Sequence, residues 1–152
     1  MDAIDRKILG ALQEDAGRAV AEIAEQVGLS PSPCWRRIQK LEADRVIRGR
    51  VALLDPEKLN VGVTVFMAVR TDRHELGWLE SFAAAVADIP EIVEFYRMSG
   101  EVDYLLKVVA PDIAGFDAVY KKLIARVPLS DVTSSFAMER IKETTALPLD
   151  YA

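Results

Sequence analysis

A basic run directly after two Ser-Pro pairs is the first stretch of this sequence whose residue types suit chemistry. The pairs occupy residues 30–33, and six bases but only two acids follow before residue 51. The bases are Arg36, Arg37, Lys40, Arg45, Arg48 and Arg50, and the acids are Glu42 and Asp44. Serine hydroxyls and guanidinium groups bind phosphates and base edges, so the run suits a polyanion-binding surface. A solvated helix face would explain the charge equally well.

The Ser-Pro pairs predict the start of a helix. Ser30 suits the N-cap, because its hydroxyl can accept a hydrogen bond from a free N–H of the first turn. Pro31 suits the first helical position, and Pro33 still lies in the first turn, whose N–H groups have no partner within the helix. We therefore expect a helix from Ser30 to about Asp44. Its buried stripe is expected to comprise Cys34, Ile38 and Leu41.

Two shorter amphipathic patterns precede this helix. Apolar residues recur at helical spacing from Ile4 to Leu12 and again from Val20 to Val27. Gly28 follows directly, at a position where helix ends favour a left-handed glycine. Three helices with a Gly-Leu-Ser turn between the last two predict a helix-turn-helix. Residues 48–54 then alternate like a strand, which predicts a winged helix-turn-helix domain over residues 1–54.

The second half of the chain has a different pattern, after a linker expected at residues 55–62. Strand-like runs cover Val63–Thr71, Ile92–Met98, Tyr104–Ala110 and Asp131–Lys142. Between them, apolar residues at helical spacing run from Leu76 to Ile89 and from Ile113 to Val127, and a proline follows each run. The order β-α-β-β-α-β predicts a ferredoxin-like domain over residues 63–152, with an antiparallel sheet and both helices on one face. The fold class is therefore α+β.

The first strand of that domain predicts self-association. Val63–Val69 carries apolar side chains on both faces, because the alternate set includes Phe66 and Ala68. Strands that are apolar on both faces are covered on both faces, and the two helices can cover only one. We therefore expect the other face to bury against a second copy of the chain.

Composition narrows the class of protein. The chain has 152 residues, of which 51% are hydrophobic, a net charge of −5 and one cysteine. One cysteine excludes an internal disulfide framework, and no apolar run approaches the roughly 20 residues that span a bilayer. The start of the chain is charged and does not read as a secretory signal, so a cytoplasmic protein is expected.

Residues 1–60 have no net charge and residues 61–152 carry −5, so the basic run is a local feature.

The sequence offers little for metal binding or catalysis. His74 is the only histidine, and neither a second histidine nor the cysteine lies near it. A metal site and a histidine-based catalytic pair are therefore not expected. A phosphate-binding glycine loop and a nucleophile elbow are also missing. We expect no catalytic residue, no metal ligand and no cofactor.

Four stretches carry a family resemblance. They are IDRKILGALQED from Ile4, GLSPSPCWRRIQKLEADRVIRG from Gly28, SGEVDYLLKV from Ser99 and VTSSFAMERIK from Val132. In this order and spacing they resemble the Lrp/AsnC, or feast/famine, family of bacterial and archaeal transcription regulators. The resemblance covers essentially the whole chain. It implies an N-terminal helix-turn-helix that binds DNA and a C-terminal ferredoxin-like domain of the kind found in amino-acid-binding regulatory modules.

The resemblance also implies an assembly and an effector. Members form dimers that commonly assemble into octamers, or into other multiples of dimers. Many bind a free amino acid between dimers, which changes DNA affinity or assembly. The expected function is therefore that of a sequence-specific transcription regulator, in the cytoplasm and on the nucleoid when bound to DNA.

For DNA, the resemblance makes the helix from Ser30 the recognition helix, whose first residues meet base edges in the major groove. The residues expected to contact DNA are Ser30, Ser32, Arg36, Arg37, Lys40, Arg48 and Arg50. Hydroxyls and first-turn N–H groups suit phosphate, and an arginine can bond guanine through two N–H groups. As an alternative, one of the arginines pairs with Glu42 or Asp44. Trp35 is expected to pack at the domain edge away from DNA, and Cys34 to be a core residue and not a redox sensor.

For the effector, SGEVDY resembles the family's glycine-acid-x-Asp-Tyr signature, with Glu101 where an aspartate is more usual. The expected residues are Ser99, Gly100, Glu101, Asp103, Tyr104, Thr133, Ser134 and Ser135. Such a turn offers backbone groups to an α-carboxylate, with Asp103 as the acid for the α-ammonium group. Hydroxyls on the last strand are expected to line the same cleft. The alternative is a plain hairpin turn held by Gly100, with a hydrogen-bonding aspartate.

Two other classes of protein stay open. A ferredoxin-like enzyme is one, since that sheet also carries small catalysts. Its only candidate acid–base pair would be Glu101 and Asp103, and the basic helix would have no role. The other is an effector-binding protein with a vestigial helix-turn-helix. In that case, replacing Arg36 and Arg37 with alanine would leave DNA binding unchanged.

Overall fold

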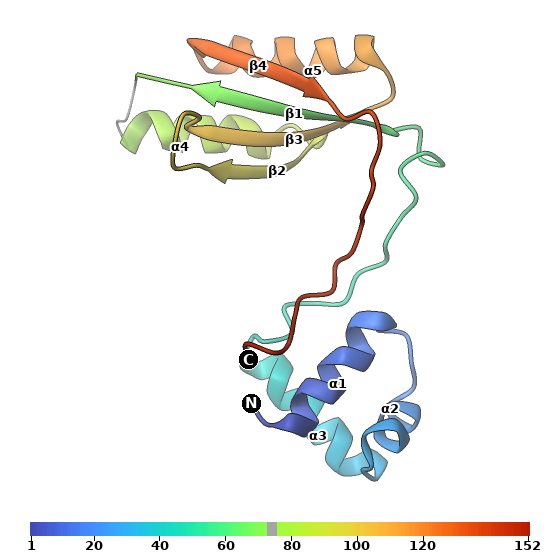
Figure 1. The fold of residues 1–152 in the computed structure, drawn as a ribbon. Helices are drawn as coiled ribbons and strands as arrows, with labels where there is room; N and C mark the ends of the chain where they lie inside the picture. The colour runs from blue at the N-terminus through green and yellow to red at the C-terminus, as the bar shows by residue number, and fades with distance from the viewer. Residues whose placement is uncertain (73–75) are drawn as a thin grey trace. The chain divides into compact units, whose positions relative to one another are not determined.

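The computed structural model describes residues 1–72 and 76–152, which divide into two compact units. Unit 1 comprises Met1–Leu53 together with Ile141–Ala152, and unit 2 comprises Leu54–Arg140. Each unit encloses its own hydrophobic core, and Figure 1 traces the elements of both. His74 lies outside the described residues.

Unit 1 contains three helices, as predicted. They are α1 (Ala3–Glu14), α2 (Val20–Val27) and α3 (Pro31–Ala43). A reciprocal pair of caps starts α1: the Asp2 carboxylate accepts the N–H groups of Ile4 and Asp5, and the Asp5 carboxylate accepts the N–H of Asp2. The helices enclose a core formed by Ile8, Leu9, Ala11, Ile23, Ala24, Val27, Cys34, Ile38 and Leu41. Cys34 is thus a core residue, and burial raises the pKa of its thiol.

The turn between α2 and α3 has the expected chemistry, with one difference. Gly28 is left-handed at φ 74°, and the N–H of Leu29 donates to the Ala24 carbonyl over 2.8 Å. Ser30 is the N-cap of α3 and Pro31 its first residue, as predicted. The Ser30 side chain, however, makes no capping hydrogen bond, so the hydroxyl stays exposed to solvent.

The end of α3 adopts a conformation that usually selects glycine. Arg45 has φ 58°, and the N–H of Val46 donates to the Leu41 carbonyl over 2.9 Å. This is the hydrogen bond of a Schellman motif, in which the left-handed residue is most often glycine. An arginine there carries the steric cost of a left-handed backbone.

The strand predicted at residues 48–54 is wrong for the described structure. The segment has no regular secondary structure, and Val51 and Leu53 are 80% and 73% exposed. Alternating apolar residues fit a strand, but a strand also needs a neighbour for its backbone hydrogen bonds. The described part of unit 1 contains helices and no strand, so the helix-turn-helix has no wing here.

The last segment of the chain, Ile141–Ala152, belongs to unit 1 although the sequence reading placed it with the second domain. The side-chain amide of Gln13 makes two hydrogen bonds with the backbone of Leu147: it donates to the carbonyl over 3.1 Å and accepts the N–H over 2.7 Å. Leu149 packs against the three-helix core, and the Arg6 guanidinium donates to the carbonyl of Ala152. These contacts attach the segment to α1.

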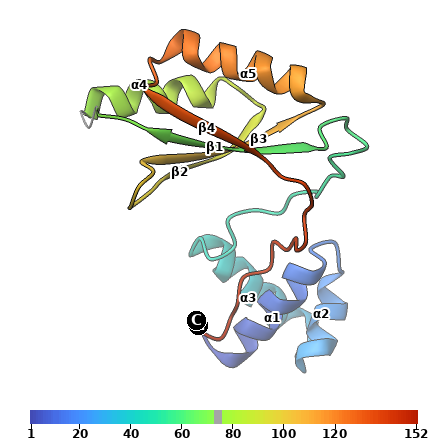
Figure 2. The same cartoon turned by 45° about the horizontal axis from the view of Figure 1, so that its top comes forward.

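Unit 2 has the predicted β-α-β-β-α-β order. Its elements are β1 (Val63–Arg70), α4 (Leu76–Ala87), β2 (Ile92–Arg97), β3 (Tyr104–Ala110), α5 (Ile113–Arg126) and β4 (Asp131–Phe136). The strands form one antiparallel sheet in the order β2-β3-β1-β4, and Figure 2 shows both helices on the same face. β4 ends at Phe136, short of the predicted Lys142, because its pairing with β1 ends where Val65 faces Phe136.

The two faces of the sheet differ in polarity. On the helix side Val65, Met67 and Val69 are fully buried. On the open side Phe66 is 39% exposed and lies opposite Lys107, whose ammonium group is 2.8 Å from the Glu94 carboxylate. Hydrogen bonds from Lys107 and from the Tyr96 hydroxyl hold the pKa of Glu94 below its usual value. The open face is therefore more polar than β1 alone indicated, and its burial against a second copy stays a prediction.

Candidate functional site

The outer face of α3 presents the polar residues expected to contact DNA. Ser32, Arg36 and Lys40 are exposed, on the side opposite the buried stripe. The helical period sets this arrangement, because positions three and four apart share a face. Trp35 lies on the same face and is 52% exposed, so packing at the domain edge covers only half of its surface.

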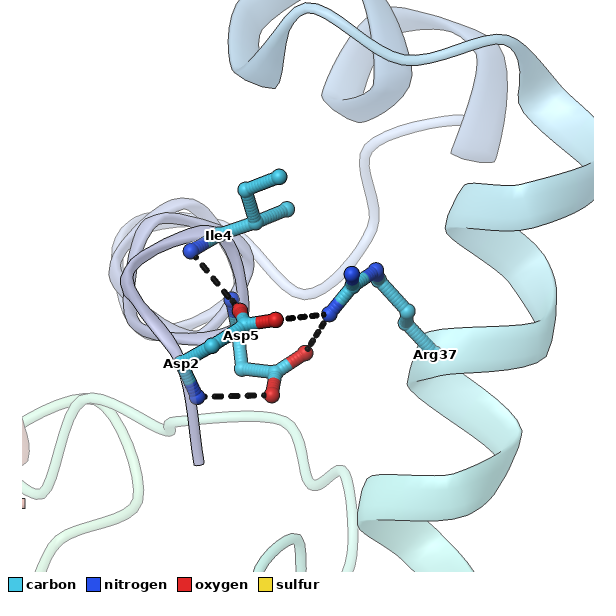
Figure 3. A network of polar contacts seen from close by, with 4 residues as sticks. All are labelled: Asp2, Ile4, Asp5 and Arg37. Atoms are coloured by element: carbon cyan, nitrogen blue, oxygen red, sulfur yellow. Dashed lines mark hydrogen bonds and ion pairs between the residues drawn. The ribbon is translucent and has the colours of Figure 1, made fainter.

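Arg37 behaves differently from its neighbour Arg36. Figure 3 shows its guanidinium facing the carboxylates of Asp2, the N-cap of α1, and of Asp5 in the first turn. Nη1 lies 2.7 Å from Oδ2 of Asp2 and 2.7 Å from Oδ1 of Asp5. These hydrogen bonds raise the pKa of Arg37. The N–H of Asp5, followed by Arg37, lowers the pKa of Asp2. Sequence reasoning missed this cluster because the partners are 35 and 32 positions apart.

A hollow of about 670 Å³ separates the start of α1 from the first turns of α3. Met1, Asp2 and Asp5 line one side, and Pro33, Arg36, Arg37 and Lys40 line the other. One wall therefore carries acids and the other carries bases. A phosphate deep in this hollow would meet the carboxylates as well as the cations, so the outer rim near Arg36 and Lys40 is the better place for an anion.

The two arginines beyond α3 also differ from each other. Arg50 forms an ion pair with Glu42, with Nη2 2.8 Å from Oε1, so the alternative that an arginine pairs with Glu42 is confirmed for Arg50. The second carboxylate oxygen of Glu42 accepts the side-chain amide of Gln39 over 2.9 Å. Arg48 is exposed in the irregular segment. Within residues 1–72 and 76–152, Arg36, Lys40 and Arg48 have no ion pair.

The turn expected to hold the effector joins β2 to β3. Gly100 has φ 128°, a conformation that requires glycine. Asp103 fixes the turn to the end of β1: its carboxylate accepts the N–H of Thr71 over 2.8 Å, and its own N–H donates to the Val69 carbonyl over 3.0 Å. These are the contacts of the alternative reading, a hairpin held by glycine and a hydrogen-bonding aspartate. The role of Asp103 toward an ammonium group stays a prediction.

An arginine that the sequence reading did not select lies beside this turn. Arg70, at the end of β1, is 3.7 Å from the Glu101 carboxylate and 3.6 Å from the Asp131 carboxylate at the start of β4. It links the turn that carries Ser99 and Gly100 to the first residue of β4. The sequence feature that could have identified Arg70 is its position as a single charged residue at the end of an otherwise largely apolar strand.

The structure does not bring all the expected effector residues together. Tyr104 is 4% exposed on the helix side, where its ring packs against Trp78, Phe82 and Phe95. Ser134 faces Met67 on that side, whereas Thr133 and Ser135 face Ala68 and Phe66 on the open side. Because successive strand residues point to opposite faces, the three hydroxyls of β4 cannot line one cleft within this chain.

The described ranges contain no group of three His, Cys, Asp or Glu side chains that could hold a metal ion. None of the described helices combines the length and the apolar character that crossing a membrane requires.

Two protein-family models match the chain, one in its first part and one in its second. An AsnC-type helix-turn-helix domain matches residues 1–42, and an Lrp/AsnC ligand binding domain matches residues 64–147. The chain belongs to the Lrp/AsnC family of transcriptional regulators. Among its relatives is the glutamate uptake regulatory protein of Zymomonas mobilis subsp. mobilis, 50% identical over 149 residues, which are 98% of this chain and 91% of the relative.

Two solved structures of similar proteins have the same fold. An AsnC family transcriptional regulator from Agrobacterium tumefaciens is 63% identical with a TM-score of 0.97, and the match covers 99% of each chain. A transcriptional regulator from Neisseria meningitidis, in complex with L-methionine, is 39% identical with a TM-score of 0.94. That match covers 99% of this chain and 98% of the other. The Lrp/AsnC chain described here is thus a transcription regulator with a helix-turn-helix domain and a ligand-binding domain.

Proposed function

We propose that this regulator binds duplex DNA through the outer face of α3. The observation that carries the proposal is the division of the α3 cations. Arg36 and Lys40 are exposed and free of ion pairs among the described residues, whereas Arg37 is held by Asp2 and Asp5. The positive charge left for a polyanion therefore lies on the face that also presents Ser32. The exposed Ser30 hydroxyl at the N-cap of α3 and the exposed Arg48 in the segment after α3 are further candidates for contact with DNA.

In this arrangement, phosphate contacts fix the register and base contacts choose the sequence. Arg36 can bond a guanine through two N–H groups. The hydroxyls of Ser30 and Ser32 and the backbone N–H of Ser32 can bond phosphates, whereas Pro31 and Pro33 have no N–H to offer. Arg37 and Arg50 act mainly by positioning α3 and the segment after it, because both already have carboxylate partners.

The protein acts as a homo-oligomer of dimers, octameric in its full form, in the cytoplasm and without a catalytic activity. Two recognition helices related by a two-fold axis read half-sites about 34–36 Å apart, or multiples of that distance. The open face of the sheet, with Phe66 part-exposed, supports such an association.

The second unit binds a free amino acid between dimers. Support comes from the Lrp/AsnC ligand binding domain and from the neighbour that was solved with L-methionine. The turn at Gly100 has Glu101 and Arg70 beside it, and these charges of opposite sign suit the ammonium and carboxylate groups of an amino acid. Thr133 and Ser135 reach such a ligand from the open face, and completion of the site by a second chain accounts for the hydroxyls that one chain leaves apart.

Fluorescence anisotropy tests both parts. A DNA fragment from upstream of the protein's own gene and a scrambled fragment are titrated with protein at one stated salt concentration. Each common amino acid is then added, beginning with methionine and glutamate. Preference for the natural fragment, shifted by an amino acid, supports regulator and sensor together. Binding that no amino acid alters removes the sensor. Equal binding to both fragments and to other genomic fragments, even at low salt, contradicts the DNA proposal.

A further inference from the structure

Trp35 is a large aromatic side chain that the core of unit 1 does not use. It is 52% exposed, and it is neither a core residue nor one of the partly buried side chains packed against that core. The neighbouring positions toward the interior, Cys34 and Ile38, are buried at 0% and 1% exposure. The core is therefore complete without the indole ring.

The position of Trp35 on α3 matters more than its exposure. Ser32 lies three residues before it and Arg36 directly after it, and all three are exposed on one face. Trp35 also falls in the first half of the helix, where helix-turn-helix proteins contact base edges. The exposed Arg36 and Lys40 favour a polyanion at this surface over an apolar protein partner.

We propose that Trp35 reads a thymine in the major groove, through contact of its indole ring with the C5-methyl group, and so sets base preference at one position of the site. The inference rests on the proposed binding of DNA by α3. The thymine methyl is the one apolar group that base edges present in the major groove, and apolar side chains recognise it. The indole carries no charge and releases no counterion, so its contact with a methyl group adds nothing to the salt slope, and its contribution depends on the base it meets.

The test begins with DNA chosen by the protein itself. Duplexes are enriched from a randomised library by the wild-type protein at a stated salt concentration, and the consensus is determined. Each thymine of the consensus is then replaced with deoxyuridine, which removes only the methyl group. For the wild type, one position in each half-site should lose affinity by several-fold, within the range for a single base contact. The Trp35→Ala variant should be indifferent to that replacement.

Two protein variants sharpen the result. Trp35→Ala should bind the consensus about tenfold more weakly, which equals about 1.4 kcal/mol, with an unchanged salt slope. Lys40→Ala is the comparison variant on the same helix. It removes a cation suited to phosphate, so its salt slope should become shallower by roughly 0.9, the value for one phosphate. Trp35→Phe keeps an aromatic ring and should retain most of the preference, which separates base reading from loss of folding.

The outcomes are distinct. If the library yields no consensus, the proposed function fails. If a consensus emerges but Trp35→Ala binds it as the wild type does, with the same sensitivity to deoxyuridine, the role of Trp35 is wrong and the DNA proposal stands. Acrylamide quenching gives an independent check, with Trp35→Phe used to subtract the emission of buried Trp78. Protection of Trp35 that grows with protein concentration in the absence of DNA would overturn the inference in favour of a protein contact.

Discussion

The guanidinium of Arg37 on α3 lies 2.7 Å from the carboxylate of Asp2, the residue that caps α1. One side chain therefore both starts the first helix and neutralises a cation of the third. Asp5 adds a second carboxylate at 2.7 Å, so the charge that α3 presents to a ligand depends on α1.

Removing one of these carboxylates should make Arg37 available to DNA. We expect Asp5→Asn to raise affinity for a scrambled duplex and to steepen the salt slope by up to about 0.9, the value for one more phosphate contact. Asn keeps the size of the side chain. Glu80→Gln removes the same charge from an exposed position of unit 2 and should leave the slope unchanged. Equal slopes for Asp5→Asn and the wild type would show that loss of the Asp5 charge does not release Arg37 to DNA while Asp2 still holds it.

The pKa of the Asp2 carboxyl should lie below its ordinary value of 3.8 in the folded protein. A lowered pKa means that the carboxylate stabilises the fold above about pH 4, and that this stabilisation is lost as pH falls through the folded value. A carboxyl ¹³C titration by NMR measures it directly. In Arg37→Ala the pKa should rise only part of the way to 3.8, since the N–H of Asp5 still donates to it. A wild-type value at or above 3.8 would contradict the capping geometry.

Arg45→Gly should stabilise the protein by about 0.5–1 kcal/mol, since glycine adopts φ 58° without the steric cost that arginine carries. Urea unfolding monitored by circular dichroism gives the difference. Arg45→Ala removes the same side chain but keeps a Cβ, so it should show no gain. Equal effects of the two substitutions would assign the change to the lost charge and not to the backbone.

Leu149→Ala should destabilise unit 1 by about 1 kcal/mol, below the usual range for a fully buried leucine because this side chain is only partly buried. Leu147→Ala is the control, because Leu147 is 71% exposed and is held through its backbone. Hydrogen exchange of the α1 amides should increase for the first variant and stay as in the wild type for the second. Similar exchange in both would mean that the segment contributes no packing.

Gly100→Ala should distort the turn between β2 and β3. A Cβ added there meets no atom within 4 Å, so the whole cost comes from φ 128° and should be about 1–3 kcal/mol. Gly49→Ala also meets no atom within 4 Å and should be near neutral. If the turn binds the effector, the amino-acid-dependent shift in DNA affinity should weaken in the first variant only. An unchanged shift would move the effector site away from the turn.

Features set by neighbouring residues were predictable from the sequence. The three helices of unit 1, Gly28 at the end of α2, Pro31 at the start of α3 and the buried Cys34 follow from local spacing and turn chemistry. The β-α-β-β-α-β order follows from the change in hydrophobic period. The sequence also contained the information that Tyr104 points toward the helices, because Tyr104, Leu106 and Val108 occupy alternate positions of one strand and therefore share a face.

Features that depend on distant residues were not. Nothing near Arg37 in the sequence points to Asp2, and nothing near Leu149 points to α1. The irregular segment at 48–54 shows the reverse problem, since its local pattern fits a strand while the described chain supplies no partner strand. In each case the missing information was which part of the chain lies next to the residue in the folded structure. The spacing of residues along the sequence does not contain that information.

The assignment of Ile141–Ala152 to unit 1 has a consequence for how the protein is made. The ribosome completes α1, α2 and α3 first, and then all of unit 2, before it releases the segment that contacts Gln13 and packs Leu149. During synthesis the helix-turn-helix thus waits for its final packing partner. A nascent chain stalled within unit 2 would therefore lack the hydrogen bonds between Gln13 and Leu147 and the packing of Leu149 against the three-helix core.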